Sequence, residues 1–349
     1  MIPKLGDPTV YPLFDAIECV VTRDVDGTYE LDLTIPMKTL QEKYYYFYLG
    51  QIIKAAPNKN QDAQNFLITD IHKALGEQCT IHAVHSSYLY NSLMLDPWRL
   101  LQPVTSIYAF QLIEQHVVSD DKIQTPVFSY VWGETWTDTL RDLKKPTALR
   151  PFLLGPLLDD FGGMIDFVGD TVVWKPRIGE DRGASVIYGA NMLSLSISEV
   201  ATDYVTGIYP FYGELGGDKP FTTLTNPIIH RRGSYEYPEN VYPLDLTSEF
   251  FATPTEQQLQ DAAMTKAQKL FVDPPKELEF SLIPRDQEKD IRLDDDILVR
   301  CGPLGESEKR RIRRLEFDVL RERVQKITVG NVIPTLADNI IGTGGIIQL

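Results

Sequence analysis

The sequence predicts a mainly β protein with α+β parts, in which two small β-barrels carry peripheral mixed α/β elements. Three observations predict this class. Alternation of apolar and polar residues, the pattern of half-buried strands, recurs through residues 1–95. Residues 96–185 mix helical and strand patterns. Strand patterns then return at about residue 186 and continue, interrupted by one long helix, to about residue 335.

The first region reads as a small barrel or sandwich. Glu18–Arg23 and Thr28–Ile35 alternate, and Asp24-Val-Asp-Gly27 between them predicts a hairpin turn, because glycine accepts a positive φ. The same run resembles the start of a calcium loop, but the required glutamate is missing from the right frame, which favours the turn. Further strands are expected at about 49–56, 65–72 and 78–87.

The middle region is predicted to mix helices with a second hairpin. Residues 108–118 have apolar side chains at helical spacing, and a helix is expected at about 151–161, although Pro156 disfavours its first turn. The strands Met164–Phe167 and Thr171–Lys175 flank a Gly169-Asp170 turn.

The last region returns to strands, at Leu193–Val200, Tyr204–Pro210 and, further on, at about 277–283, 296–300, 312–320 and 323–329. Residues 213–255 show little periodicity. The clearest helix follows Thr255, its expected N-cap, and stops before Pro274-Pro275. The apolar, glycine-rich tail Gly342–Leu349 is expected to be loose unless a partner covers it.

Composition limits the classes of function. The formal net charge of −15 argues against a protein that grips nucleic-acid backbones, although DNA could slide past such a surface. No apolar run approaches the roughly 18–20 residues that span a bilayer, and the start lacks the core of a signal peptide, so neither membrane anchoring nor export by that route is expected. The isolated Cys19, Cys79 and Cys301 predict reduced thiols, and Cys19 and Cys301, in alternating strands, are expected to be buried.

A search for catalytic, metal and cofactor chemistry yields no candidate site residue. The five histidines are His72, His82, His85, His116 and His230. His82 and His85 are three apart in an expected strand, so they should point to opposite faces and not share a metal. Cys79 lies near them in sequence, but neighbouring strand positions do not make a nucleophile and its base. Neither a Gly-x-Ser-x-Gly elbow nor a P-loop occurs.

Three charged or aromatic groups allow two interpretations each. Asp294–Asp296, with Glu288 and Asp290, predict a solvated loop, or else a channel-facing acidic ring or cation site. The basic run from Lys309 to Arg311, with Arg313 and Arg314, predicts ion pairs between subunits or plain exposure, ahead of nucleic-acid binding. The aromatic side chains Tyr130, Trp132 and Trp136 favour core packing, with binding of sugar or a neighbouring subunit as the alternative.

Several segments, taken in order, resemble the prophage tail protein family of siphophages, whose name also refers to an endopeptidase. They are DVDGTYELDLTIP, YLGQIIKA, NFLITDIHKA, CTIHAVHSSYLYN, GMIDFVGDTVVWKPRIGEDRGASVIYGANML, VATDYVTGIYPFYGE and the closing DDDILVRCGPLGESEKRRIRRLEFDVLRERVQKITVGN. The Asp181-Arg-Gly triplet and the Tyr188-Gly-x-Asn191 step are each weak alone. Their order and spacing over roughly residues 10–335 carry the resemblance.

The resemblance implies a baseplate hub with two barrels per chain, so that a homotrimer presents six barrels to a sixfold tube. It implies a first barrel at 1–95, an outer mixed domain at 96–185, a second barrel at 186–212 and 277–335, an inserted helix-containing domain at 213–276, and a tail at 336–349. The implied partners are the distal tail protein, the tape-measure protein and receptor-binding proteins, while genome DNA passes through without specific binding. The implied location is the virion tail tip, assembled in the cytoplasm of a Gram-positive host.

Two other functions remain open at this point. In this family, endopeptidase activity sits in C-terminal extensions, and the chain stops at Leu349, where the hub fold should just have ended, so we expect no enzyme. A host-saccharide adhesin would use exposed aromatic side chains such as Trp132 or Trp136.

Overall fold

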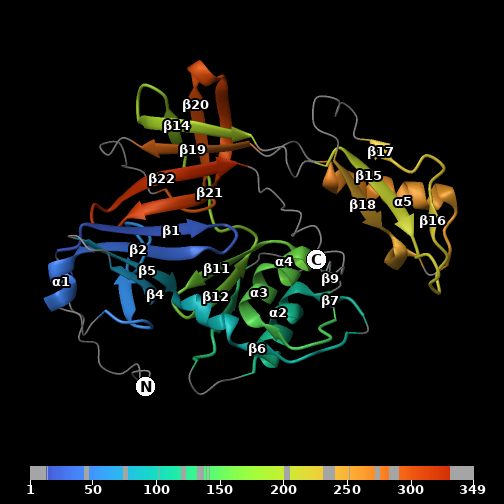
Figure 1. Ribbon diagram of the computed structural model, residues 1–349, viewed down its shortest axis with the longest axis horizontal. Coiled ribbons are helices and arrows are strands. Elements are labelled where there is room, and N and C mark those ends of the chain that lie inside the picture. The colour runs from blue at the N-terminus through green and yellow to red at the C-terminus, as the bar shows by residue number, and fades with distance from the viewer. Residues whose placement is uncertain are drawn as a thin grey trace. The chain divides into compact units, whose positions relative to one another are not determined.

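The computed structural model describes residues 13, 15–42, 47–73, 78–100, 102–118, 123–131, 137–138, 140, 142–199, 205–230, 240–250, 252–271, 276–282 and 291–330. The chain divides into two compact units (Figure 1). The first unit comprises residues 1–196 and 278–330, and the second comprises residues 197–277 and 331–349.

An eleven-stranded sheet dominates the first unit (Figure 1). Nine strands follow one path, in the order β14 (Met192–Glu199), β19 (Lys276–Leu282), β22 (Arg323–Gly330), β21 (Glu306–Asp318), β1 (Glu18–Asp24), β2 (Tyr29–Pro36), β5 (Gln78–His85), β4 (Gln64–Lys73) and β3 (Ile52–Ala55). Off this path, β20 (Asp296–Cys301) pairs with β21, and β13 (Ala184–Ile187) pairs with β20. The short helix α1 (Met37–Glu42) follows β2.

Strand β21 joins the two groups of strands that the sequence assigns to separate barrels. It has 13 residues, and its first half pairs with β20 while its second half pairs with β1. The pairings of the described strands run from β14 to β3 without closing into a ring. The mainly β class is therefore confirmed, whereas the two barrels and the predicted domain boundaries stay predictions.

The predicted hairpin between β1 and β2 is confirmed. Its turn is held by side chains of its own, because the backbone N–H of Asp26 donates to the carboxylate of Asp24, and that of Thr28 donates to the carboxylate of Asp26. Gly27 has a φ of +96°, as the turn requires.

The mixed part of the first unit has its own apolar core. It is built by α2 (Ser106–His116), α3 (Leu149–Leu154), α4 (Pro156–Phe161), the sheet β11 (Met164–Val168), β12 (Thr171–Lys175) and β8 (Val127–Tyr130), and the paired short strands β6 (Met94–Leu95), β10 (Thr147–Ala148), β7 (Val104–Thr105) and β9 (Thr137–Asp138). Trp174 and Phe152 are almost fully buried there. The hairpin of β11 and β12 is confirmed, but the single helix predicted at 151–161 is wrong. Two helices meet at Gly155, because Pro156 lacks the N–H that would continue α3 and begins α4.

The described residues of the second unit form a four-stranded sheet and one α-helix. The sheet contains β15 (Gly207–Tyr212), β16 (Thr222–Thr223), β17 (Ile229–His230) and β18 (Val241–Asp245). The predicted helix is α5 (Glu256–Leu270), and Thr255 and Gln258 form its capping box. The sequence did not predict β16 to β18, because strands this short show little periodicity. No helix among the described residues is long and apolar enough to cross a membrane.

Candidate functional site: two buried ion-pair clusters

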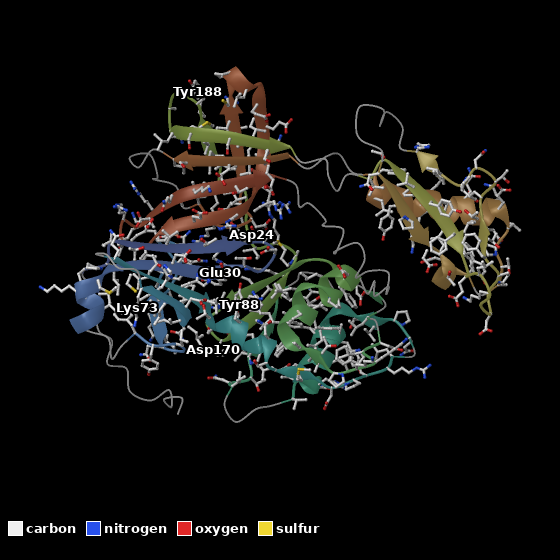
Figure 2. The ribbon with its side chains drawn as sticks, in the orientation of Figure 1. Asp24, Glu30, Lys73, Tyr88, Asp170 and Tyr188 are labelled. Carbon is white, nitrogen blue, oxygen red and sulfur yellow. The ribbon has the colours of Figure 1, made fainter. Side chains whose placement is uncertain are left out.

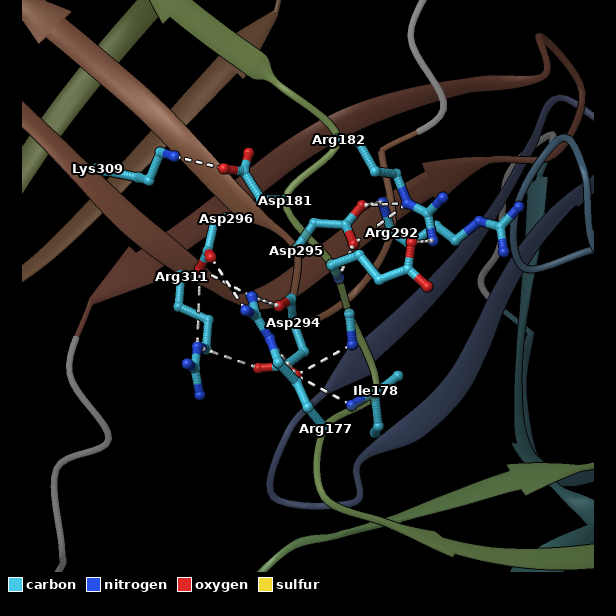
Figure 3. Close-up of polar contacts among 12 residues, drawn as sticks. Arg177, Ile178, Asp181, Arg182, Arg292, Asp294, Asp295, Asp296, Lys309 and Arg311 are labelled. Carbon is cyan, nitrogen blue, oxygen red and sulfur yellow. Dashed lines mark hydrogen bonds and ion pairs between the residues drawn. The ribbon is translucent and has the colours of Figure 1, made fainter. Parts of the chain in front are cut away.

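The acidic run lies at a turn that leads into β20, and two of its three carboxylates are buried. Asp294 and Asp295 have exposed fractions of 1% and 0%. Asp294 has a φ of +66°, and its backbone N–H donates to the carbonyl of Ile312 on β21. Figure 3 shows the carboxylates turned toward the segment 177–182, which comes from far away in the sequence. The run is thus an internal element, and its prediction as a solvated loop was wrong.

The carboxylate of Asp294 holds the backbone of that segment. Its Oδ2 accepts hydrogen bonds from the N–H groups of Ile178 and Gly179, both at 3.0 Å. The approach requires glycine, because a Cβ on Gly179 would lie 2.1 Å from the carbonyl carbon of Asp294. Backbone N–H groups thus satisfy Oδ2 of a buried carboxylate, whereas its Oδ1 accepts no hydrogen bond and lies 3.5 Å from Nε of Arg311.

Asp295 continues this arrangement with the next residues. Its Oδ1 accepts from the N–H of Glu180 at 2.7 Å, and its Oδ2 accepts from the N–H of Arg292 at 2.9 Å. The guanidinium of Arg182 adds an ion pair at 3.1 Å. Burial raises the pKa of the Asp295 carboxyl, although these hydrogen bonds and Arg182 oppose the rise.

The Asp-Arg-Gly triplet has a structural explanation in this cluster. Asp181 accepts from the N–H of Gly183, whose φ is +65°, and forms an ion pair with Lys309 on β21. Arg182 reaches Asp295 as described. The three residues together fasten the segment 177–183 to the β20–β21 hairpin.

The basic run on β21 is neutralised largely within the chain. Arg310 pairs with Glu308 at 2.9 Å, and Arg311 lies 3.5 Å from Asp294 (Figure 3). Arg314 pairs with Glu316 at 3.7 Å. These ion pairs are intramolecular, and the side chains of Lys309, Arg311 and Arg314 are exposed, so the predicted exposure is confirmed for them, while contacts between subunits stay a prediction.

The Tyr-Gly-x-Asn step protects a strand edge. The side-chain amide of Asn191 accepts from the N–H of Ile187 and donates to the carbonyl of Ser185, both at 2.8 Å. It therefore takes the place of a neighbouring strand along β13. Unpaired backbone N–H and carbonyl groups at a strand edge favour pairing with strands of other chains. Because the Asn191 amide occupies these groups of Ile187 and Ser185, it disfavours the addition of another strand along β13.

A second cluster joins the large sheet to the mixed part of the first unit. Asp166 on β11 pairs with Arg23 on β1 at 2.7 Å and with Lys175 on β12 at 2.9 Å. Burial opposes ionisation of Asp166, but the two cations outweigh it and lower its pKa. This cluster was not predicted from the sequence. The one feature that could have indicated it is the position of the Asp166 carboxylate between the apolar residues Ile165 and Phe167.

Arg150 on α3 contacts the tip of the β1–β2 hairpin. Its Nη2 donates to the carbonyl of Gly27, and its guanidinium lies 3.9 Å from the ring centre of Tyr88. The Tyr88 hydroxyl donates to Glu30 on β2, and Figure 2 labels both residues. A cation over an aromatic ring in a partly buried site is stabilising.

His85, a candidate in the peptidase search, is a buried structural residue. Its ring stacks on Tyr29 at 4.2 Å, its Nδ1 accepts from the N–H of Ser87, and its Nε2 lies 3.4 Å from Gln64 Oε1. Burial, followed by Arg23, lowers its pKa to about 3. A fully buried imidazole of this kind cannot reach an external substrate.

The remaining histidines are dispersed. His82 lies on the opposite face of β5, as predicted, and pairs with Asp32 at 2.8 Å. His116 binds the carbonyl of Leu112 in its own helix, while His72 and His230 are exposed on β4 and β17. Within the described residues, no group of three or more His, Cys, Asp or Glu side chains is arranged to hold a metal ion.

Cys19 and Cys301 are buried, as predicted, and Cys79 is buried as well. Burial, reinforced by Asp318, raises the pKa of Cys19 to about 12, and burial also raises that of Cys79. Neither thiol is therefore tuned toward a reactive thiolate at neutral pH.

The predicted aromatic patch is only partly described. Tyr130 packs at the core, where its hydroxyl lies 2.6 Å from Ser106 Oγ and its ring centre lies 5.5 Å from that of Trp174. Trp132 and Trp136 lie outside the described residues, as do Glu288, Asp290 and the tail at 336–349.

No protein-family model matches the chain, and no curated protein matches it. Solved structures do match. The prophage tail protein gp18 from Listeria monocytogenes EGD-e has a TM-score of 0.55 at 14% identity, covering 95% of this chain and 94% of that one. The 43 kDa tail protein of prophage MuSo2 from Shewanella oneidensis has a TM-score of 0.58 at 12% identity, covering 91% and 94%. The tail protein from Neisseria meningitidis MC58 has a TM-score of 0.57 at 9% identity, covering 90% and 92%.

These identities are low, so the likeness concerns the fold. These structural neighbours are tail proteins, two of them from prophages, and at this level the resemblance predicted from the sequence is confirmed.

Proposed function

We propose that this chain is a structural protein of a long-tailed phage or prophage tail, and that it acts as a trimeric hub at the tail tip. The single observation that supports this most is the shared fold, which extends over at least 90% of the chain in three tail proteins. A likeness that includes both units favours a common architecture over one shared module.

The strand arrangement supports the hub in particular. Two groups of strands flank β21, with β1 to β5 on one side and β13, β14, β19, β20 and β22 on the other. In the proposed assembly each group is one barrel of the tube. Three chains with two such surfaces each would match a sixfold ring.

The proposed mechanism is mechanical, and the chain is proposed not to be an enzyme. The trimer closes the tail tube, joins the distal tail protein to the receptor-binding proteins, and opens on host contact so that the tape-measure protein and DNA can pass. The net charge of −15 supports passage of DNA without binding, because like charges repel. Assembly in the cytoplasm of a Gram-positive host belongs to the same proposal.

The oligomeric mass tests the hub. Light scattering on the purified full chain should give about three times 39.6 kDa at micromolar concentration. The distal tail protein of the same phage or prophage should bind this trimer and form a larger complex. A stable monomer that does not bind the distal tail protein would count decisively against the hub.

A further inference from the structure

Among the described residues, a helix covers the sheet of the second unit on one side only. Along β15, Ile208 and Tyr212 are buried and pack in one cluster with Leu259 and Ala263 of α5. Since neighbouring residues of a strand point to opposite faces, Tyr209 and Phe211 lie on the face away from α5.

That second face is apolar and aromatic, and we call it the aromatic face. Cross-strand pairing places Pro243 of β18 beside Tyr209. Phe221 stacks on Phe211, with ring centres 6.1 Å apart and planes at 27°, and 45% of Phe221 is exposed. At the other end of the strand, Ile228 packs against Gly207, because a Cβ added to Gly207 would lie 3.2 Å from Cγ2 of Ile228. Ile228 is 37% exposed.

Two titratable side chains among the described residues stand at positions paired into this face, Asp245 and His230, and His230 Nδ1 would lie 3.5 Å from a Cβ on Gly207. Asp245 pairs with Phe211 across the strands and is exposed, which places it on the aromatic face, and its Oδ1 also accepts from the N–H of Thr247 at 2.8 Å. Glu214 and Asp218 are exposed in the loop that connects β15 to β16. The ammonium of Lys219 is not available here, because it donates to the carbonyl of Thr247 and lies 5.4 Å from the ring centre of Tyr212, on the side of α5.

Among the described residues, no lysine or arginine stands at a position paired into the aromatic face. Exposed apolar surface of this kind marks interaction sites in soluble proteins. Ring faces beside carboxylates attract a guanidinium or ammonium group, because the cation interacts favourably with both the ring quadrupole and the negative charge.

We propose that the aromatic face binds a segment of a partner protein in which arginine or lysine alternates with apolar residues. The apolar side chains pack on Tyr209, Phe221 and Pro243, while the cationic groups lie over the rings and pair with Asp245. This inference rests on the second unit alone and does not depend on the proposed tail role.

The test uses the full chain and a short fluorescent peptide of alternating arginine and valine, with a glutamate–valine peptide as the charge control. Fluorescence anisotropy should show binding of the arginine peptide alone, and the binding should weaken as salt is raised. Phe221→Ala should weaken it about tenfold, and Asp245→Asn should weaken it about threefold at low salt. Phe221→Leu keeps the apolar contact and loses the ring, so an intermediate affinity is expected.

Matched controls lie on α5. Met264→Ala removes a side chain of nearly the same exposure as Phe221, 46%, and Asp261→Asn removes a carboxylate from the helix, so both variants should bind like the parent chain. Equal binding of the two peptides, or equal affinity of Phe221→Ala and Met264→Ala, would overturn the proposal. It would also be overturned by self-association through this face, or by a neutral oligosaccharide that displaces the peptide.

Discussion

Removing one partner of the buried ion pair of Arg23 and Asp166 should cost far more stability than removing one partner of an exposed pair of the same length. Only 10% of the Arg23 side chain and 6% of the Asp166 side chain are exposed, and their contact is 2.7 Å. Asp166→Ala leaves the Arg23 guanidinium buried without its carboxylate, and such a loss costs about 3–5 kcal/mol. The pair Lys326–Glu279 has the same 2.7 Å contact but exposed fractions of 34% and 44%, so Glu279→Ala should cost about 0–1 kcal/mol.

The assay is urea unfolding followed by tryptophan fluorescence, because all four tryptophans lie within residues 1–196 and report on the first unit. The double variant Arg23→Met with Asp166→Leu should recover part of the loss, since apolar replacements remove both buried charges. Equal losses in Asp166→Ala and Glu279→Ala would refute the reasoning.

The same carboxylate predicts a pH dependence. Arg23 and Lys175 outweigh burial and hold the pKa of Asp166 below its ordinary 3.8 in the folded chain. Its contribution to stability is therefore present above that value and is lost as the pH falls through the lower, folded pKa. Asp166→Asn should remove this acid-dependent part, which is measured as the difference between the two stability curves below pH 4.

Three further predictions concern single residues. Gly179→Ala should destabilise the first unit by about 3 kcal/mol or more, because the new Cβ meets the backbone of Asp294 at 2.1 Å; an unchanged urea midpoint would contradict this. His85 has a folded pKa of about 3 against 6.5, so the unfolded state alone takes up its proton and stability falls from pH 6.5 toward pH 3; His85→Phe should flatten that slope in urea titrations at stepped pH. Asn191→Ala should open the β13 edge at Ile187 and promote self-association detectable by light scattering, and a chain that stays at its parent mass would refute the edge plug.

Local chemistry made part of the fold predictable. The turn at Asp24–Gly27 and the N-cap at Thr255 are encoded within a few residues, and both predictions are confirmed. The helix predicted at 151–161 failed locally, because Pro156 starts a second helix instead of being tolerated within the first.

The candidate site depends on residues that are distant in the sequence. Asp294 and Asp295 were predicted to be solvated because the N–H groups that satisfy them belong to residues 178–180, more than 100 positions earlier. Asp166 likewise meets Arg23 across 143 positions, and no periodicity in either strand signals the pair. The order of the family-like segments along the chain was enough to predict the similarity to tail proteins. The role of each motif in the fold, by contrast, depends on these contacts between residues that are distant in the sequence.

The most direct test of the proposed tail role is the location of the chain in assembled particles. Particles released from the strain that encodes it should be examined by electron microscopy with gold-labelled antibody to the purified chain. We predict label at the end of the tail farthest from the capsid. Particles with intact tails that carry no label there, and that lack the chain by mass spectrometry, would contradict it.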